Sequence, residues 1–185
     1  AATELPVLSI VPSLHNPMLL VLDLNNCILF RKERSSKGSK MPIPRPYLAP
    51  FLEYVCGFER IAWVEGEGGE VGRRFATVVY SSARSYNVLS MIAALSLVPA
   101  PRAALHERGK PWAAKPGDAL EMVFSREMMG LSPAEFEQNV ETVKDLAGLW
   151  KGLGQRWSAE RTVLLDDEPF KAVGLPATFH SHSHY

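Results

Sequence analysis

The sequence predicts an α/β fold with a central, mostly parallel sheet, because short apolar segments of strand length alternate with segments of helical periodicity. The apolar segments are residues 18–22, 75–80 and 161–165. Between them, residues 47–55 and 86–97 carry apolar side chains at helical spacing. Strand 18–22 contains no polar residue, which is typical of a strand covered on both faces. Parallel strands need crossover connections, and the intervening helices can supply them.

Each of the three predicted strands is followed by a polar residue. Asp23 follows the first strand, Ser81 the second, and the pair Asp166-Asp167 the third. The carboxyl ends of parallel strands lie at one edge of a sheet, where ligands bind in open α/β folds. The same side chains have structural alternatives, because Asp and Ser also cap turns and helix N-termini. Their occurrence at three strand ends favours a functional site.

Further along the chain, Ser132 to Glu135 forms a capping-box pattern with Pro133 at the first helical position. Spacing alone would continue this helix from residue 133 to residue 150. Another helix is expected to begin at Pro169.

We expect a single domain over residues 18–185, preceded by an extended lead-in over residues 1–17. The basic segment 31–45 is expected to form a loop or flap, either as a recruitment surface for an acidic partner or simply as a solvated loop. A Gly- and Glu-rich insertion near residues 64–73 and a proline-rich loop over residues 98–118 interrupt the regular elements.

Composition narrows the classes of partner. The 185 residues include 20 Lys and Arg and 20 Asp and Glu, so no net charge indicates nucleic acid as a partner. No apolar run approaches the roughly 20 residues that span a bilayer. The cysteines, Cys27 and Cys56, form no disulfide framework and fit an intracellular compartment, with the nucleus and the mitochondrion both open.

The strand-end residues suit phosphoryl transfer. An Asp at the tip of a buried strand can attack a phosphoryl group as a nucleophile. A divalent cation offsets the repulsion between the two anions, and further carboxylates supply the oxygen ligands that Mg²⁺ prefers. A hydroxyl and a lysine then hold the phosphoryl oxygens. Asp23, Ser81, Lys144 and the Asp166-Asp167 pair provide these groups in this order.

This order resembles the haloacid-dehalogenase (HAD) superfamily, and more narrowly its FCP1 homology branch, which contains the RNA-polymerase C-terminal-domain phosphatases and the NLI-interacting-factor-like proteins. The family's D-x-D-x-[TV], R-P-x…F-L, phosphate-binding, K-D-L and D-D-S-P segments are matched at residues 22–27, 45–52, 79–83, 143–146 and 163–169. The resemblance implies a HAD-like Rossmannoid three-layer sandwich. It also implies that the predicted helix breaks near residues 141–143, so that Lys144 points into the site.

The resemblance further implies a catalytic role for individual residues. Asp23 would be the nucleophile, and Ser81, Ser82 and Lys144 would bind the phosphoryl oxygens. The family has an acid–base Asp where this chain has Asn25. An amide can neither protonate a leaving group nor activate water, and positioned acid–base catalysis contributes on the order of 10²–10⁴-fold.

The resemblance implies Mg²⁺ as cofactor. Asp23 would be a metal ligand, and Asn25 would offer its backbone carbonyl. Asp167 would be the direct ligand of the acidic pair, with Asp166 beside it. After Lys171 the family continues with another strand and more helix, so we expect this sequence to be part of a larger protein or complex.

Two hypotheses follow. The first is a Mg²⁺-dependent phosphatase that acts on phosphoserine or phosphothreonine in a protein. The second is a weak or inactive pseudophosphatase that serves as a protein-binding or structural subunit. Asn25 favours the second hypothesis, whereas the retention of Asp23, Lys144 and the acidic pair favours the first. The family contains at least one member that is a mitochondrial protein-import subunit.

Overall fold

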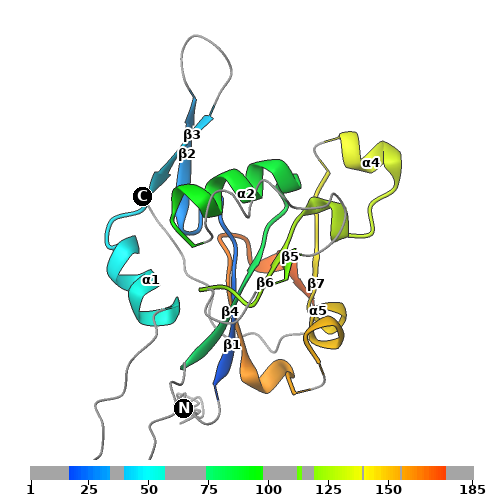
Figure 1. Ribbon diagram of the computed structural model, residues 1–185. Helices are drawn as coiled ribbons and strands as arrows, with labels where there is room; N and C mark the ends of the chain where they lie inside the picture. Colours follow the sequence, from blue (N-terminus) through cyan, green and yellow to red (C-terminus); the bar gives the residue numbers. More distant parts are fainter. Residues whose placement is uncertain are drawn as a thin grey trace, which may run out of the picture.

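The computed structural model describes the predicted strands and the segments that connect them. The described residues are 17–33, 40–56, 74–97, 112–113, 119–138, 140–154 and 156–173. The predicted lead-in up to residue 16, the Gly- and Glu-rich insertion and most of the proline-rich loop lie outside this set. Figure 1 shows the arrangement of the described elements, most of them labelled. None of the described helices is both long and apolar enough to cross a membrane.

The main sheet, within the described residues, has five strands in the order β5-β6-β4-β1-β8. The bounds are Met18–Leu22 for β1, Phe75–Tyr80 for β4, Trp112–Ala113 for β5, Met122–Phe124 for β6 and Thr162–Leu165 for β8. Strands β6, β4, β1 and β8 run parallel, and β5 is antiparallel at the edge. The predicted parallel sheet is confirmed. Strand β6 escapes the sequence pattern because three residues are too few to show a strand period.

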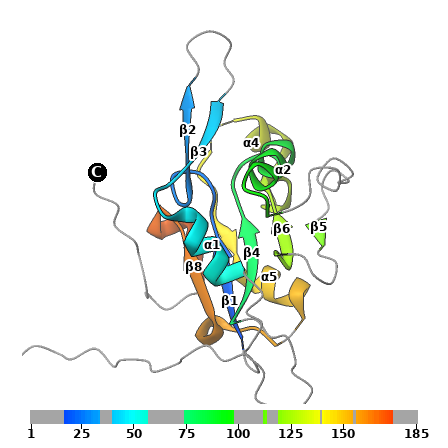
Figure 2. The same cartoon turned by 60° about the vertical axis from the view of Figure 1, so that its left-hand side comes forward.

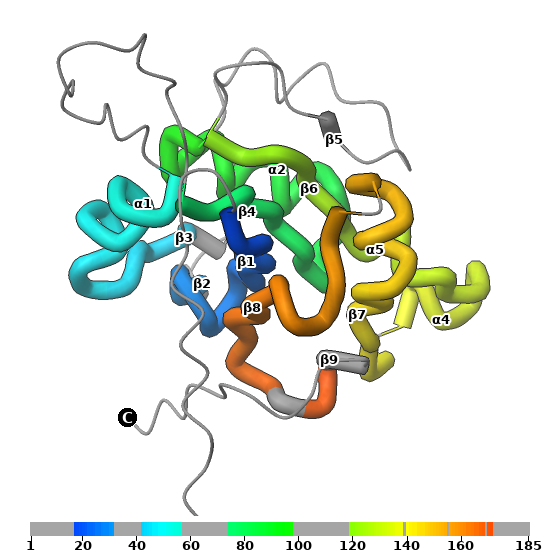
Figure 3. Tube along the Cα trace, turned by 90° about the horizontal axis from the view of Figure 1, so that it is seen from below, coloured from blue at the N-terminus to red at the C-terminus, as the bar shows by residue number. Residues whose placement is uncertain are grey.

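Helices cover both faces of this sheet, which confirms the α/β sandwich (Figure 2 and Figure 3). The bounds are Leu48–Cys56 for α1, Ser85–Ala94 for α2 and Leu146–Leu153 for α5. Leu20 and Leu22 of β1 belong to the core cluster with α1 and α2. Leu19 and Val21 belong to the cluster with α5. Since successive strand residues point to opposite faces, the uniformly apolar β1 is buried on both sides.

The predicted break before Lys144 is also confirmed. Helix α4 spans only Pro133–Glu137 and begins at the predicted capping box. The chain then enters β7 (Lys144–Asp145), which pairs in parallel with β9 (Ala172–Val173) before α5 begins. The guanidinium of the buried Arg126 donates to three backbone carbonyls between residues 135 and 138, and these bonds hold the end of α4. Helical spacing alone misses this break, because the tertiary contacts of Lys144 decide it.

A β-hairpin forms part of the basic segment that was predicted to be a flap. Strand β2 (Leu29–Glu33) pairs antiparallel with β3 (Lys40–Pro44), and the hairpin projects beyond the carboxyl ends of β1 and β4 (Figure 2). Residues 34–39 at its tip lie outside the described residues.

The helix expected to begin at Pro169 is instead a short 3-10 turn. It spans Pro169–Lys171 and passes directly into β9, whose pairing with β7 ends the turn. The other described 3-10 turns are Arg126–Met128 and Ala159–Arg161.

Candidate active site

Three parallel strands deliver their polar end residues to one edge of the sheet. Asp23 follows β1, with 2% of its surface exposed, and its backbone N–H donates to the carbonyl of Leu165 at 2.9 Å. Ser81 follows β4, is fully buried, and donates its backbone N–H to Phe124 at 3.1 Å. The sheet hydrogen bonding thus continues to these residues and fixes where their side chains begin.

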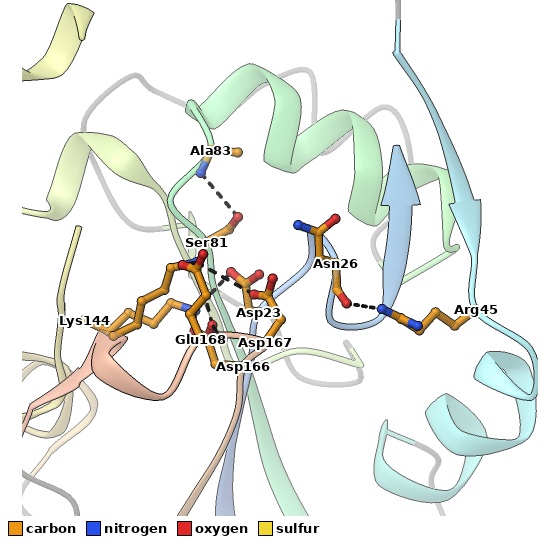
Figure 4. A network of polar contacts seen from close by, with 10 residues as sticks. Asp23, Asn26, Arg45, Ser81, Ala83, Lys144, Asp166, Asp167 and Glu168 are labelled. Atoms are coloured by element: carbon orange, nitrogen blue, oxygen red, sulfur yellow. Dashed lines mark hydrogen bonds and ion pairs between the residues drawn. The ribbon is translucent and has the colours of Figure 1, made fainter. Parts of the chain in front are cut away.

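Lys144 connects two of these strand ends, as Figure 4 shows. Its fully buried ammonium lies 3.0 Å from Asp23 Oδ1 and also donates to Asp166 Oδ2. A buried charge is very costly unless it is paired, so Lys144 and the two carboxylates stabilise one another. This arrangement agrees with the inward orientation of Lys144 that the family resemblance implied.

The two carboxylates that follow β8, Asp166 and Asp167, differ in how many hydrogen bonds they accept. Asp166 Oδ1 accepts a hydrogen bond from the backbone N–H of Glu168 at 3.1 Å, and Oδ2 contacts Lys144. Asp166 therefore has the turn-capping role that was the structural alternative, in addition to its ion pair. By contrast, Asp167 Oδ1 is buried and has no hydrogen-bond partner among the described residues. The ammonium of Lys171 lies 3.8 Å from this oxygen, beyond hydrogen-bond distance, so Asp167 keeps acceptor capacity that a metal ion could use.

The donor atoms fit a hard divalent cation. Carboxylate oxygens of Asp23, Asp166 and Asp167 lie within 4.8 Å of one another. The amide oxygen of Asn25 is likewise buried without a hydrogen bond among the described residues. Oxygen donors of this kind suit Mg²⁺, which is usually held by one or two carboxylates, with waters completing its octahedron. The acidic cluster could therefore hold a metal ion.

Burial sets the electrostatics of these carboxyl groups. Desolvation raises the pKa of Asp23 to about 6, although the nearby Lys144 opposes the shift. Desolvation also raises the pKa of Asp167, with the negative charge of Asp166 adding to the effect against the attraction of Lys171. Both groups therefore resist ionisation in the protein alone, and a cation at the cluster would offset this resistance.

The hydroxyl of Ser81 is oriented by the turn that follows it. Its oxygen accepts a hydrogen bond from the backbone N–H of Ala83 at 3.3 Å, which leaves the hydroxyl proton to donate (Figure 4). Ser81 does not cap helix α2. The N-terminus of that helix is instead satisfied by Glu127, whose carboxylate accepts from the backbone and side chain of Ser85.

A pocket of about 340 Å³ adjoins the acidic cluster. It is lined by Ser82, Arg126, Val140, Glu141, Thr142, Glu168, Phe170 and Lys171. Ser82, the chain neighbour of Ser81, thus lines this pocket, whereas Asp23, Ser81 and Lys144 are buried and are not among its lining residues.

The turn after Asp23 is held from outside by Arg45. The guanidinium of Arg45 donates to the backbone carbonyl of Asn26 (Figure 4). Asn26 has a φ of 59°, in the left-handed region that Asn tolerates better than most residues. Arg45, the first residue of the Arg-Pro segment, thus holds the turn that contains the half-buried Asn25.

Sequence reasoning missed Lys171 as a site residue. Its ammonium lies 3.7 Å from Asp166 Oδ1, 3.8 Å from Asp167 Oδ1 and 2.5 Å from Glu168 Oε2. Burial of Lys171 opposes its charge, but the hydrogen bond to Glu168 and the attraction of Asp166 raise its pKa. The signal in the sequence was spacing: Lys171 follows Asp167 by four residues and Glu168 by three, and such pairs come together in one helical turn. The short 3-10 turn is long enough to bring them together here.

The fold and the carboxylates at its sheet edge define a Rossmann-like α/β protein with a cluster suited to a metal ion. No family model matches the sequence. The chain is 29% identical over 174 residues to an uncharacterized FCP1 homology domain-containing protein of Schizosaccharomyces pombe, which corresponds to 87% of this chain and 58% of that protein. The chain thus spans less than two thirds of this relative. The similarity supports the assignment of the chain to the FCP1 homology type of the HAD superfamily.

Proposed function

We propose that this chain is a Mg²⁺-dependent phosphatase of the aspartyl-phosphate type, acting on phosphoserine or phosphothreonine in a protein. The observation that carries the proposal is the buried contact of Lys144 with both Asp23 and Asp166 at the carboxyl edge of the sheet. The FCP1 homology in the name of the yeast relative supports a phosphatase-like domain.

The chemistry is nucleophilic. A carboxylate oxygen of Asp23 attacks phosphorus and forms an acyl phosphate, and the bond from phosphorus to the substrate oxygen breaks. When bound, Mg²⁺ supplies positive charge that offsets the repulsion between nucleophile and phosphoryl group. Asp23 and Asp167 would hold it, with the carbonyl of Asn25. Lys144 and the hydroxyl of Ser81 bind phosphoryl oxygens, and Lys144 also keeps Asp23 oriented.

Two proton transfers have no acid–base group at the usual position. The departing alkoxide needs a proton, and the water that hydrolyses the acyl phosphate must lose one. The amide of Asn25 performs neither transfer, so water has to carry both protons. We therefore expect slow turnover, by on the order of 10²–10⁴-fold relative to a chain with a carboxyl group there.

Phosphate release from an aryl phosphate in the presence of Mg²⁺ tests the proposal. We expect slow release by the wild type, none by Asp23→Asn, and faster release by Asn25→Asp. Asn26→Asp is the matched control, since it makes the same chemical change at the exposed neighbouring residue. A variant Asp23→Asn that hydrolyses the ester at the wild-type rate would exclude Asp23 as nucleophile and contradict the proposal.

The second candidate is a pseudophosphatase that binds a protein through the same pocket. The identity of Asn25 is the observation that favours it, and the buried amide oxygen of Asn25, which has no hydrogen-bond partner among the described residues, is free to accept from a bound group. A silent wild type with an active Asn25→Asp variant would support this candidate. If both are silent and neither binds Mg²⁺, a purely structural role in a larger assembly is favoured.

The basic hairpin supports a protein partner with acidic or phosphorylated residues. Arg31 and Arg45 lie at the described base of the hairpin, on the carboxyl side of the sheet. Titration with matched phosphorylated and unphosphorylated peptides would test this, with tighter binding of the phosphorylated form as the expected result.

A further inference from the structure

Lys171 places a second ammonium group beside the carboxylate cluster, and the proposed reaction does not use it. Its side chain is only 11% exposed, so the charge has been brought largely out of water. Its neighbours are Asp166, Asp167 and Glu168, all within 4 Å of the ammonium nitrogen. A lysine held in this way is part of the site and not a solvated surface residue.

The charges of the cluster explain why the protein alone needs this lysine. Three carboxylates, from Asp23, Asp166 and Asp167, lie within 4.8 Å of one another. Lys144 contacts Asp23 and Asp166, whereas Asp167 forms its ion pair with Lys171. Without Lys171, the buried oxygen of Asp167 would face its acidic neighbours with no cation close to it.

A pocket beside the cluster could accommodate the ammonium group of Lys171 if it left the carboxylates. Lys171 lines the pocket of about 340 Å³, and so does the exposed Glu141. Glu141 therefore adds a second carboxylate to Glu168 on the lining of this pocket. The flexible four-carbon stem of lysine allows such a change by side-chain rotation alone.

We infer that Lys171 is an internal counter-cation that competes with Mg²⁺ for Asp166 and Asp167 and turns into this pocket when the metal binds. The inference rests on the proposed Mg²⁺ site. Its consequence is a low affinity for Mg²⁺, because binding must first break the ion pairs of Lys171 and then place a divalent charge close to an ammonium group. The site would therefore fill only at high free Mg²⁺.

Calorimetric titration of Mg²⁺ into the chain tests the inference without any turnover. Lys171→Met should bind Mg²⁺ about tenfold more tightly than the wild type, because the competing charge is gone. Lys171→Arg keeps a cation and should bind with the wild-type affinity. Lys151→Met is the matched control, since it removes an exposed lysine of α5 and should leave the affinity unchanged.

The outcomes separate this inference from the metal site itself. Equal Mg²⁺ affinity in the wild type and Lys171→Met would overturn the inference and leave the metal site intact. Absence of Mg²⁺ binding in both would overturn the metal site together with the inference. The rise in melting temperature caused by Mg²⁺ is a second measurement, made also on Lys171→Gln, and should be larger in both neutral variants than in the wild type. A smaller rise in both would likewise overturn the inference.

Discussion

The two sides of the candidate site differ in how completely their polar atoms are satisfied. On the β8 side, Lys144 connects Asp23 and Asp166, and Asp166 also accepts from the following turn. On the hairpin side, the buried atoms Asn25 Oδ1, Arg31 Nε and Arg45 Nε have no hydrogen-bond partner among the described residues. Buried polar groups are nearly always paired in native proteins. The β8 side leaves only Asp167 Oδ1 without a hydrogen bond among the described residues, and the ammonium of Lys171 lies 3.8 Å from that oxygen. The hairpin side leaves two donors and an acceptor for water, substrate or a partner.

The largest expected effect is that of removing the buried cation Lys144 from the β8 side. Lys144→Met leaves Asp23 and Asp166 buried without their shared partner, and breaking a buried ion pair costs roughly 3–5 kcal/mol. We expect a loss of this size in the free energy of unfolding, measured by urea denaturation, together with loss of any phosphatase activity. Lys151→Met, at an exposed position, should change stability by less than about 0.5 kcal/mol. A loss in Lys144→Met no larger than in the control would contradict this account.

The next effect concerns pH and Asp23. Its pKa is raised to about 6 in the folded protein, from 3.8, so the folded state holds this proton more tightly than the unfolded state. The contribution of Asp23 to stability is therefore fully present below pH 4 and is lost as pH rises through about 6. Relative to Asp23→Asn, the metal-free wild type should lose roughly 3 kcal/mol across this window.

Urea denaturation of both proteins at several pH values, with a chelator present, measures this difference. Parallel stability profiles for the wild type and Asp23→Asn would show that burial does not raise the pKa of Asp23.

The smallest effect is expected on the hairpin side. Arg45→Ala removes the hydrogen bond to the backbone carbonyl of Asn26, which is worth about 1 kcal/mol. Because this bond holds the turn that carries Asn25, we also expect weaker binding of a phosphorylated peptide. Peptide titration and urea denaturation of the same variant measure both quantities. A loss of stability as large as that of Lys144→Met would remove the distinction between the two sides.

The strands that build the site were predictable because each combines an uninterrupted apolar run with a polar end residue. The segments 18–22 and 75–80 match β1 and β4 in both bounds, and Asp23 and Ser81 follow from them. The break before Lys144 came from the resemblance, since helical spacing continues through residues 138–143, whereas pairing with β9 holds Lys144 and Asp145 in an extended conformation. Lys171 was missed although its spacing from Asp167 and Glu168 was a signal, because the spacing alone does not show that the 3-10 turn after β8 places its ammonium beside the acidic pair.

The ion pair between Asp23 and Lys144 joins residues 121 positions apart in the chain. Strand β1 lies between β4 and β8, so the central strand emerges from the ribosome long before its neighbour on one side exists. Until Lys144 and β8 are synthesised, Asp23 has no counter-charge and the apolar β1 has an open edge, and closing so long a loop is slow. Nascent chains that end before Lys144 should therefore be prone to aggregation or chaperone capture, and the site should form only late in synthesis.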